Sequence, residues 1–254
     1  MGALHEGHAA LIRRARRKAG PSGNVVVSIF VNPTQFGPKE DFSRYPRPFS
    51  ADRDLCARLG VDILFHPDAA AMYPTGFSTY VQEEEVGMGL CGGSRPGHFR
   101  GVCTVVLKLF HIVQPDAAIF GLKDFQQCMV LQRMVRDLNL PVQMIFAPTV
   151  RESDGLALSS RNQYLSAPER AQAPILRAAI LEARKAWRGG VTAARSLLSV
   201  VQKRIAAAPL ARTDYIAFVD AATLQPVTTV RSGDALALAV FFGKTRLIDN
   251  LIFS

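Results

Sequence analysis

Two histidines with two residues between them stand near the start of the chain, in His5-Glu6-Gly7-His8, and lead directly into a predicted helix. Histidines at this spacing lie on one face of a first helical turn, where the free N–H groups and the positive end of the helix dipole point. Glycine permits close approach of the backbone, and imidazole supplies hydrogen-bond donors. The motif therefore predicts a site for a nucleotide phosphate. Alone it is weak, because ordinary surface histidines produce the same pattern.

A second phosphate-suited segment is Gly121-Leu122-Lys123-Asp124, at a predicted strand-to-helix turn. Lys123 would reach a phosphate as a point charge, and Asp124 would cap the following helix. Gln127 lies three residues beyond Asp124 and would face the same crevice. A surface lysine beside a capping aspartate is the alternative interpretation.

A third such segment, Ser159-Ser160-Arg161, places two hydroxyls and a guanidinium in succession. Arginine can hold a terminal phosphate through two parallel hydrogen bonds. A helix-capping loop is the plainer explanation. The segment falls where we expect two domains to meet, and ligand sites concentrate at such junctions.

Side-chain amides follow the first predicted strand, 24–31. Pro33 ends its hydrogen-bonding ladder, so Asn32 and Gln35 are expected to project into the crevice at the strand end. Amides both donate and accept, which suits a ligand with hydroxyls and a carboxylate. An ordinary polar loop is the alternative. The glycine-rich basic segment 92–101 has two interpretations as well, an anion-contacting lid or a flexible connection.

Apolar, β-branched runs alternate with helical patterns through residues 1–149. This alternation predicts a doubly wound, Rossmann-like parallel sheet with helices on both faces. Ligands of such sheets bind at the carboxyl ends of the strands, where the motifs fall. The expected strands are 24–31, 62–65, 116–120 and 142–147, and the expected helices are one after His5 and those at 50–59, 102–113 and 125–138.

The pattern changes after Pro148. Alanine-rich helical segments at 168–188 and 192–208 precede strand-like runs at 214–219, 235–242 and 245–248. Helices followed by strands predict a smaller α+β domain. We therefore expect a nucleotide- and substrate-binding domain at 1–149 and a lid domain at 150–254.

The composition is that of a globular protein. The 254 residues suffice for a full core, with 48% hydrophobic and 20% charged residues. The best apolar stretch, 102–113, is interrupted by Lys108 and His111, so neither a membrane span nor a signal peptide is predicted. Four widely separated cysteines predict no zinc site and no disulfide framework. We expect a cytoplasmic protein.

The formal net charge of +9 has two explanations, nucleic-acid binding or a pocket for small anions. The densest basic run, 13–18, shares a helix with Leu11, Ile12 and Ala15, whose spacing is typical of an amphipathic helix with a solvated basic face. No RNA-recognition motif or zinc module is present in the sequence. We therefore favour small anionic ligands over nucleic acid.

In this order the blocks resemble the pantoate–β-alanine ligase family, a branch of the nucleotidylyl transferases with a His-x-Gly-His signature. The matching blocks are 1–8, 28–36, 95–108, 121–127, 150–165 and 243–250. The resemblance covers both expected domains. It implies ATP-dependent condensation of pantoate with β-alanine through a pantoyl adenylate, with release of pyrophosphate and AMP, and a homodimer.

The resemblance also implies residue roles. His5, His8 and Lys123 would carry catalysis, with His8 as a proton donor to the phosphates. Gln35 and Gln127 would hold pantoate, with Gln35 also near β-alanine and Asn32 assisting. Mg²⁺ would bridge the β- and γ-phosphates, with Asp52 as its acidic partner. Arg95 and His98 match the family motif without an implied role. The implied ATP site comprises Met1, Gly2, Ala3, Leu4, His5, Glu6, Gly7, His8, Gly121, Leu122, Lys123, Asp124, Val150, Leu158, Ser159, Ser160 and Arg161.

In the family a strand and a Pro-Thr step precede the position of Met1. Their absence from this sequence predicts an empty central place in the sheet, and either a start placed too late or a shortened N-terminal end. Two rival functions also stand: a nucleotidyl transferase that attaches AMP to a phosphate, and a basic nucleic-acid-binding module. AMP production that requires both pantoate and β-alanine would separate all three.

Overall fold

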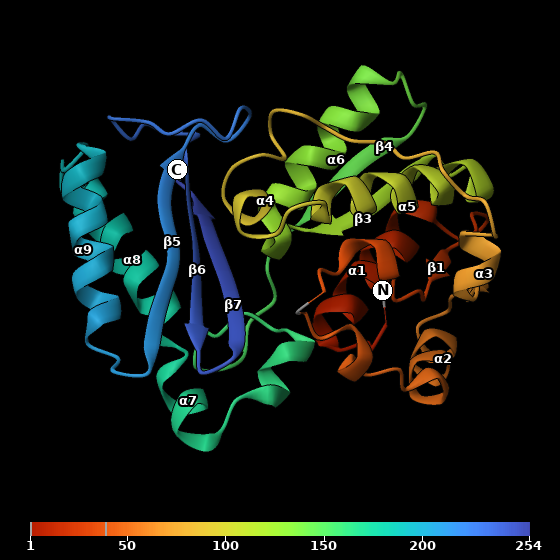
Figure 1. Cartoon of the computed structure of the whole chain (residues 1–254), viewed down its shortest axis with the longest axis horizontal. Helices are drawn as coiled ribbons and strands as arrows, with labels where there is room; N and C mark the ends of the chain where they lie inside the picture. The colour runs from red at the N-terminus through yellow and green to blue at the C-terminus, as the bar shows by residue number, and fades with distance from the viewer. Residues whose placement is uncertain (1, 39) are drawn as a thin grey trace.

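The computed structural model describes residues 2–38 and 40–254 and divides into two groups of elements (Figure 1). One group holds short parallel strands with their helices, and the other holds a three-stranded antiparallel sheet with two long helices. The fold is thus mixed α/β, with parallel strands and a C-terminal antiparallel sheet. Within the described ranges we find no helix with the length and apolar character needed to span a bilayer.

The first group contains every helix and strand that the sequence predicts for residues 1–149. α5 begins four residues earlier than expected, and β1 is shorter than the expected run 24–31. The strands are β1 (Val26–Ser28), β2 (Ile63–Phe65), β3 (Ala117–Gly121) and β4 (Gln143–Ala147). The helices are α1 (Glu6–Ala19), α2 (Phe49–Arg58), α3 (Ala69–Met72), α4 (Cys91–Ser94), α5 (His98–Val113) and α6 (Phe125–Asp137), with 3-10 turns η1 (Pro33–Gln35), η2 (Phe42–Arg44) and η3 (Leu122–Asp124).

The parallel strands form two separate pairs. β1 pairs with β2 and β3 with β4, each in parallel, and no strand within residues 2–38 and 40–254 joins the pairs. The prediction of parallel strands is confirmed. The described strands form two pairs and not one continuous sheet, and this arrangement agrees with the expected empty place at the centre of the sheet. Apolar runs between helices identify parallel strands, yet they do not say which strands are hydrogen-bonded neighbours.

Helix α1 packs against both pairs. Its buried Ile12 lies in one apolar cluster with Val25, Val27 and Ile29 from the β1 region. Its Leu11 approaches the end of β3, because a Cβ built on Gly121 would lie 3.9 Å from that side chain. α1 therefore holds the ends of β1 and β3 in fixed relation, and its own N-terminus lies beside both.

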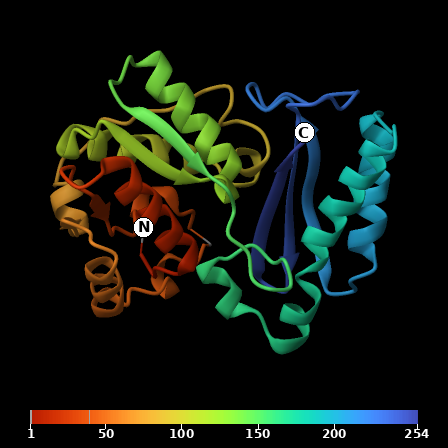
Figure 2. The ribbon, with the colours of Figure 1, turned by 180° about the vertical axis from the view of Figure 1, so that it is seen from behind.

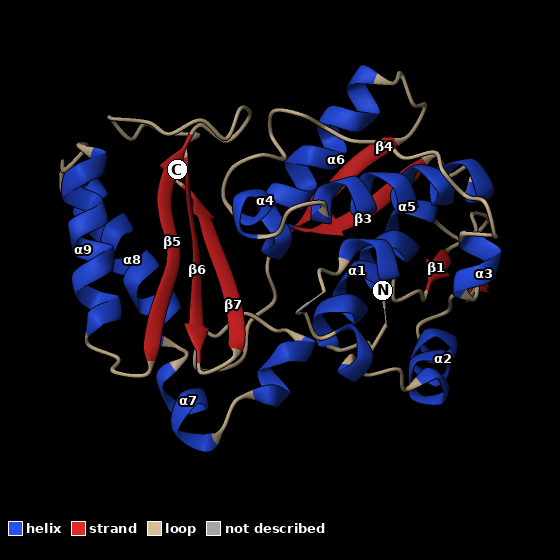
Figure 3. Cartoon of the chain, viewed as in Figure 1, coloured by secondary structure: helices blue, strands red, loops and turns tan. Residues whose placement is uncertain are grey.

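The second group buries its core between one face of the antiparallel sheet and two helices (Figure 3). Its order of helices before strands confirms the prediction, although the expected helix 168–188 is divided into α7 and α8. Pro174 stands at that division and lacks the N–H that a continuous helix needs. The elements are η4 (Ser160–Tyr164), α7 (Ala167–Gln172), α8 (Ile175–Arg188), α9 (Ala194–Ala206), β5 (Ala211–Val219), β6 (Ala235–Phe242) and β7 (Thr245–Ile252).

The two groups meet along the other side of the antiparallel sheet. Val219 and Ala235 are buried in the same apolar cluster as Val102 and Phe125 of the first group. The chain leaving β4 passes between the groups before it reaches α7 (Figure 2). The loop 148–166, which holds the third phosphate-suited segment, is thus positioned at the junction.

The first turn of α5 lies directly against η1. A Cβ on Gly101 would lie 2.4 Å from the carbonyl oxygen of Thr34 and 2.7 Å from the backbone nitrogen of Gln35. Only a residue without a side chain permits this approach, so Gly101 fixes the distance between α5 and the strand-exit loop.

Gly101→Ala should therefore lower the free energy of unfolding by about 1–3 kcal/mol, the usual cost of overpacking a rigid contact. Gly89→Ala is the matched control, because a Cβ there meets no atom within 4 Å. Denaturant titration measures both. Equal unfolding free energies for the two variants would contradict the close contact.

Candidate active site

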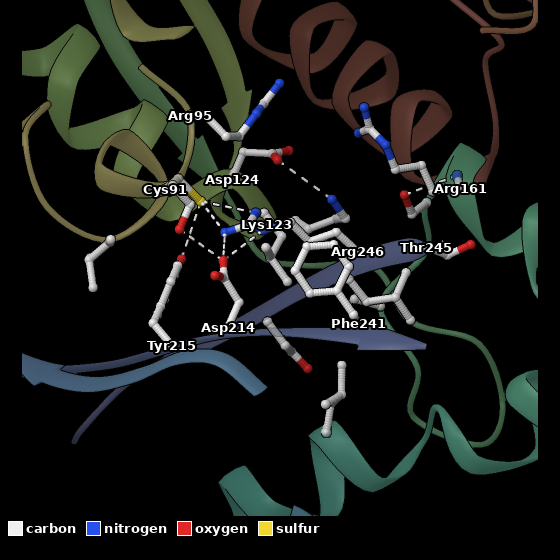
Figure 4. Close-up of a pocket in the computed structure, with 18 of the residues that line it drawn as sticks. Cys91, Arg95, Lys123, Asp124, Arg161, Asp214, Tyr215, Phe241, Thr245 and Arg246 are labelled. Atoms are coloured by element: carbon white, nitrogen blue, oxygen red, sulfur yellow. Dashed lines mark hydrogen bonds and ion pairs between the residues drawn. The ribbon is translucent and has the colours of Figure 1, made fainter. Parts of the chain in front are cut away.

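A cavity of about 1040 Å³ opens between the two groups of elements (Figure 4). Its walls come from the loop after β1, the turn after β3, the loop before α7 and the strands β5–β7. The predicted site residues that line it directly are Lys123, Asp124, Gln127, Ser159 and Arg161. Lys123, Asp124 and Arg161 carry charges and Gln127 carries an amide, so the lining can bind a polar, anionic ligand.

The two histidines form the N-terminal cap of α1. His5 is the N-cap residue, and its Nδ1 accepts from the backbone N–H of Gly7 at 3.1 Å. The Nδ1 of His8 accepts from the backbone N–H of His5 at 3.3 Å. This reciprocal arrangement satisfies two helix-terminal N–H groups with side chains that sequence reasoning treated only as ligands.

The same hydrogen bonds fix the protonation of both rings. Because each Nδ1 accepts, a neutral ring carries its proton on Nε2, which leaves one N–H donor for a ligand. Burial, then the neighbouring His5 and Lys123, lower the pKa of His8 to about 3. Burial and Lys123 lower the pKa of His5. Near neutral pH, His8 is therefore a neutral hydrogen-bond donor.

The three phosphate-suited segments lie together. The charges of Lys123 and Asp124 act on both histidines. A Cβ on Gly7 would lie 3.8 Å from Leu158, an ordinary contact distance, so the first and third segments lie side by side. The same Cβ would lie only 2.9 Å from the His5 ring, so the glycine leaves room for that ring. Leu158 donates its backbone N–H to the carbonyl of Val150 at 3.0 Å. The three phosphate-suited segments are thus parts of one site.

Several implied ATP-site positions contribute no side chain to the cavity. Glu6 pairs with Arg13 on the exposed side of α1. Gly2 lies against Ile29 and Val31, and Ala3 is buried with a positive φ of 52°. Met1 lies outside the described residues. At Gly2, Ala3 and Glu6, the backbone is what the structure can offer a ligand.

Asp124 stands at the N-cap position of α6 but makes no capping hydrogen bond with its side chain. The capping prediction is therefore wrong. Its carboxylate lies 3.5 Å from Lys123 Nζ instead, and, against the effect of burial, Lys123 and Arg161 lower its pKa. Attraction to two cations outweighs the N-cap interaction. Asn250 of β7 holds this turn, because its Nδ2 donates to the carbonyls of Leu122 and Lys123 at 2.8 and 3.0 Å.

Arg161 is held by an acid that the sequence did not reveal. Its Nε and Nη2 donate to the two carboxylate oxygens of Asp41 at 3.1 and 3.0 Å. Although burial disfavours its charge, this pairing raises the pKa of Arg161. Tyr45 donates to or accepts from Ser160 Oγ at 3.1 Å, so the same loop holds two members of the third segment.

Gln35 is fixed by Asn32. Asn32 is 2% exposed, and its Nδ2 donates to Gln35 Oε1 at 3.3 Å and to the carbonyl of Gly101 at 3.0 Å. Its Oδ1 accepts from Tyr73 Oη at 2.8 Å. Asn32 thus uses its polar atoms inside the protein and is not placed to contact a substrate. Gln35, in contrast, is held through its side-chain oxygen, which leaves its Nε2 group to donate elsewhere.

Asp52 is positioned under the first loop and not in the cavity. It is 3% exposed, and its Oδ1 accepts from the backbone N–H of Leu4 at 2.7 Å. Its Oδ2 is buried without a hydrogen-bond partner. Within residues 2–38 and 40–254, no three His, Cys, Asp or Glu side chains are grouped so as to bind a metal. The residue fits a role in holding the His5 loop, and it does not fit Mg²⁺ coordination at the cavity.

Comparisons with known proteins agree along the whole chain. The model of the pantoate-β-alanine ligase family matches residues 1–252. Pantothenate synthetase of Syntrophotalea carbinolica is 56% identical over 250 residues, 98% of this chain and 87% of the relative, and that of Moorella thermoacetica is 54% identical over 99% of this chain and 88% of the relative. The crystal structure of pantothenate synthetase from Thermus thermophilus has a TM-score of 0.96 at 49% identity, and covers 100% of this chain and 91% of that one.

The chain belongs to the pantoate–β-alanine ligase family. It is a ligase whose activity is the ATP-dependent condensation of pantoate with β-alanine in pantothenate biosynthesis. The resemblance in the sequence is thereby confirmed. A related ligase from Francisella tularensis, with a TM-score of 0.79 at 35% identity over 99% of this chain and 87% of its own, was solved complexed with Beta-gamma ATP and β-alanine.

The far end of the ligase cavity holds another network that sequence reasoning missed (Figure 4). Arg246 Nη2 donates to Asp214 Oδ2 at 2.7 Å, and its guanidinium lies 3.5 Å from Cys91 Sγ. Tyr215 Oη lies 3.2 Å from the same sulfur, and Ser94 Oγ donates to Asp214 at 3.0 Å. The network ties α4 of the first group to β5 and β7 of the second.

Residues that the sequence did not reveal share one feature. Asp41, Tyr45 and Asn250 act through partners more than a hundred residues away. Asp41 and Tyr45 could have been suspected, because their loop follows β1 at the edge of the sheet where ligands bind. Asn250 carries no local signal, since a strand asparagine ordinarily faces solvent.

The neutral histidines predict acid sensitivity. His8 and His98 have pKa values of about 3 and about 4 in the folded chain, below the usual 6.5. Below pH 6.5 these two histidines take up protons in the unfolded chain but not in the native chain. The free energy of unfolding is therefore highest above that pH and declines toward pH 4. We expect the unfolding free energy to fall by at most about 1.4 kcal/mol per pH unit for each histidine in this window.

Thermal or denaturant unfolding between pH 7 and pH 4.5 measures that slope. His8→Gln should make the slope shallower, whereas the exposed His111→Gln should leave it unchanged. The same slope in both variants would show that His8 is not held neutral.

Proposed function

We propose that the ligase activates pantoate as an acyl adenylate. A pantoate carboxylate oxygen attacks the α-phosphorus of ATP, the bond from that phosphorus to the bridging oxygen breaks, and pyrophosphate leaves. The amine of β-alanine then attacks the acyl carbon, loses a proton, and displaces AMP with the transferred oxygen. The observation that carries this proposal is the convergence of the His5–His8, Lys123 and Ser159–Arg161 segments beside one cavity.

These segments suit the charge that develops during adenylation. The α-phosphate gains negative charge as it becomes five-coordinate, and preorganised donors stabilise that charge. His5 and His8 supply Nε2–H donors, and Lys123 and Arg161 supply fixed positive charge. His8 acts here as a neutral donor. An incoming polyphosphate would share Lys123 and Arg161 with Asp124 and Asp41, which hold these cations until it binds.

Gln35 and Gln127 are proposed to bind pantoate. Asn32 makes no substrate contact but holds Gln35 Oε1, so the Nε2–H groups of Gln35 are directed outward as donors to a carboxylate or hydroxyl. Gln127 lines the cavity one helical turn after Asp124. β-Alanine, which the Francisella tularensis relative binds, would follow at the Gln35 side.

Mg²⁺ is proposed to arrive with ATP and not on a preformed protein site. The ion prefers octahedral oxygen ligands, keeps several waters and commonly takes substrate phosphates. Asp52, the acid implied by the resemblance, is buried away from the cavity and already bound to Leu4 N–H. No step is therefore assigned to a metal held by Asp52.

Further proposals concern the domain boundary, the arrangement of the sheet, the oligomeric state and the cellular location. We propose the division into 1–149 and 150–254, because the chain crosses between the groups once, after β4 (Figure 2). We also propose that the two parallel pairs belong to one doubly wound, Rossmann-like arrangement, that the ligase is a homodimer, and that it works in the cytoplasm. The chain has the same overall fold as Thermus thermophilus pantothenate synthetase, with a TM-score of 0.96 over 100% of its length.

Exchange of labelled pyrophosphate into ATP tests the proposed route. The adenylation step is reversible on the enzyme, so exchange should require pantoate but not β-alanine, and net AMP release should require both acids. A transferase that attaches AMP to a phosphate would show exchange only with its phosphate acceptor, and pantoate would not support exchange. A nucleic-acid-binding module would show no exchange and strong, salt-dependent binding to DNA or RNA. Either result would overturn the proposal.

His8→Ala and Lys123→Ala should each slow pantoate-dependent exchange by about 10²–10³, the usual cost of removing one preorganised donor. Lys203→Ala removes an exposed cation of α9 and should leave the rate unchanged. Single-turnover formation of the adenylate gives the same comparison without product release. Rates within about twofold of the parent ligase in both variants would remove these residues from the mechanism.

Asp52→Asn and Asp52→Ala separate a loop-holding role from metal binding. Asparagine keeps an oxygen that can accept from Leu4 N–H, whereas alanine does not. We expect the Mg²⁺ concentration for half-maximal rate to be unchanged in Asp52→Asn, and Asp52→Ala to lose about 1–3 kcal/mol of stability. A much higher Mg²⁺ requirement in Asp52→Asn would instead make Asp52 a ligand.

A further inference from the structure

His98 contacts Gln35 and Arg95 from the first turn of α5. It is 9% exposed, and its Nδ1 lies 2.8 Å from the carbonyl oxygen of Gln35. Its Nε2 lies 3.0 Å from Arg95 Nη1. The left-handed Gly97, with φ 80°, precedes it and turns the ring into this position.

The two partners determine the state of the ring. A carbonyl oxygen only accepts, so Nδ1 must carry a proton and donate to Gln35. Guanidinium only donates, so Nε2 must be unprotonated and accept from Arg95. Both contacts can be satisfied only by the neutral Nδ1–H tautomer, the opposite of the tautomer in His5 and His8.

A partly buried ion pair holds Arg95 in turn. Arg95 Nε and Nη2 donate to the two carboxylate oxygens of Glu40 at 2.6 and 2.7 Å, and Nη2 also reaches the carbonyl of Gln35 at 3.3 Å. The side chains of Arg95 and Glu40 are 17% and 25% exposed. Bidentate geometry fixes the guanidinium plane, which in turn presents one N–H to His98.

Gln35 is thus held at both ends. Asn32 fixes the oxygen of its side-chain amide, while His98 and Arg95 fix its backbone carbonyl. The absence of a side chain at Gly101 lets α5 approach closely enough for these contacts. The backbone hydrogen bonds within η1 are long, at 3.3 and 3.4 Å, so contacts from side chains contribute to the position of Gln35.

We infer that His98 is a positioning residue for pantoate binding, acting through Gln35. This inference rests on the proposed role of Gln35. His98 is one of the residues that line the cavity, but both of its ring nitrogens already have partners inside the protein. Its neutral ring connects the Arg95–Glu40 pair to the backbone of Gln35, the residue proposed to bind pantoate. Loss of the His98 ring should therefore weaken the binding of pantoate and leave the binding of ATP unchanged.

Three substitutions at one position test the inference. In His98→Asn, the side-chain amide can occupy the position of the ring Nδ1 and donate to the carbonyl of Gln35. In His98→Gln, the amide occupies the position of the ring Nε2 and restores only the contact with Arg95. His98→Phe keeps an aromatic ring at this position and removes the hydrogen bonds to both Gln35 and Arg95. Steady-state KM values for pantoate and for ATP, together with melting temperature, are measured for each.

We expect His98→Phe and His98→Gln to raise the KM for pantoate about 10-fold, as for one lost hydrogen bond in a binding site, with the KM for ATP unchanged. His98→Asn should restore most of the loss. If His98→Phe does not fold, the comparison of asparagine with glutamine still decides. Equal KM values for pantoate in these two variants would overturn the inference.

Gln35→Ala separates failure of this inference from failure of the proposed function. If Gln35→Ala leaves the KM for pantoate unchanged, the role of Gln35 is wrong, and the inference fails with it. If Gln35→Ala raises that KM, His98→Phe added to it should raise it no further, because no amide remains to be positioned. A further, additive rise would show that His98 acts by another route.

Discussion

The cations of this active site have to be held in place before a polyanion arrives, and carboxylates hold them. Arg161 pairs with Asp41, Lys123 with Asp124, Arg95 with Glu40 and Arg246 with Asp214, all at the cavity or its margin. An unpaired buried cation would cost far more than such pairs do, since removing one partner leaves an uncompensated charge. The pairs therefore fix the positions of the positive groups and moderate their attraction for any passing anion. A ligand has to offer several charges in the right geometry to share them.

The histidines follow a different physical rule in the same site. Their rings lie 4.1 Å apart, and burial near Lys123 makes a second positive charge costly. Each ring instead satisfies a helix-terminal N–H of α1 through Nδ1 and keeps a proton on Nε2. The cap that stabilises the helix is thus also the device that orients two ligand donors. Asp52 supports this loop from beneath through Leu4 N–H.

Much of this arrangement could be predicted from the sequence, because it depends on local patterns. Periodicity predicted α1, α2, α6 and the strands, strand-end position pointed to Gln35 and Lys123, and the expected domain junction pointed to Arg161. What could not be predicted depends on pairs distant in sequence, such as Asp41 with Arg161 or Asn250 with the Lys123 turn. Asp124 shows the converse failure, because its position predicts a cap while Lys123 and Arg161 draw its carboxylate away. Which parallel strands pair with each other could not be predicted either, because an apolar run indicates a strand but not its hydrogen-bonded partner.

Transfer of oxygen from pantoate to AMP tests the central claim most directly. With pantoate labelled with oxygen-18 in its carboxylate, attack on the α-phosphorus predicts that one labelled oxygen appears in the AMP released with each pantothenate. Mass spectrometry of that AMP gives the result in a single experiment. Unlabelled AMP from labelled pantoate would contradict the account, because the carboxylate would then have been activated by some other bond.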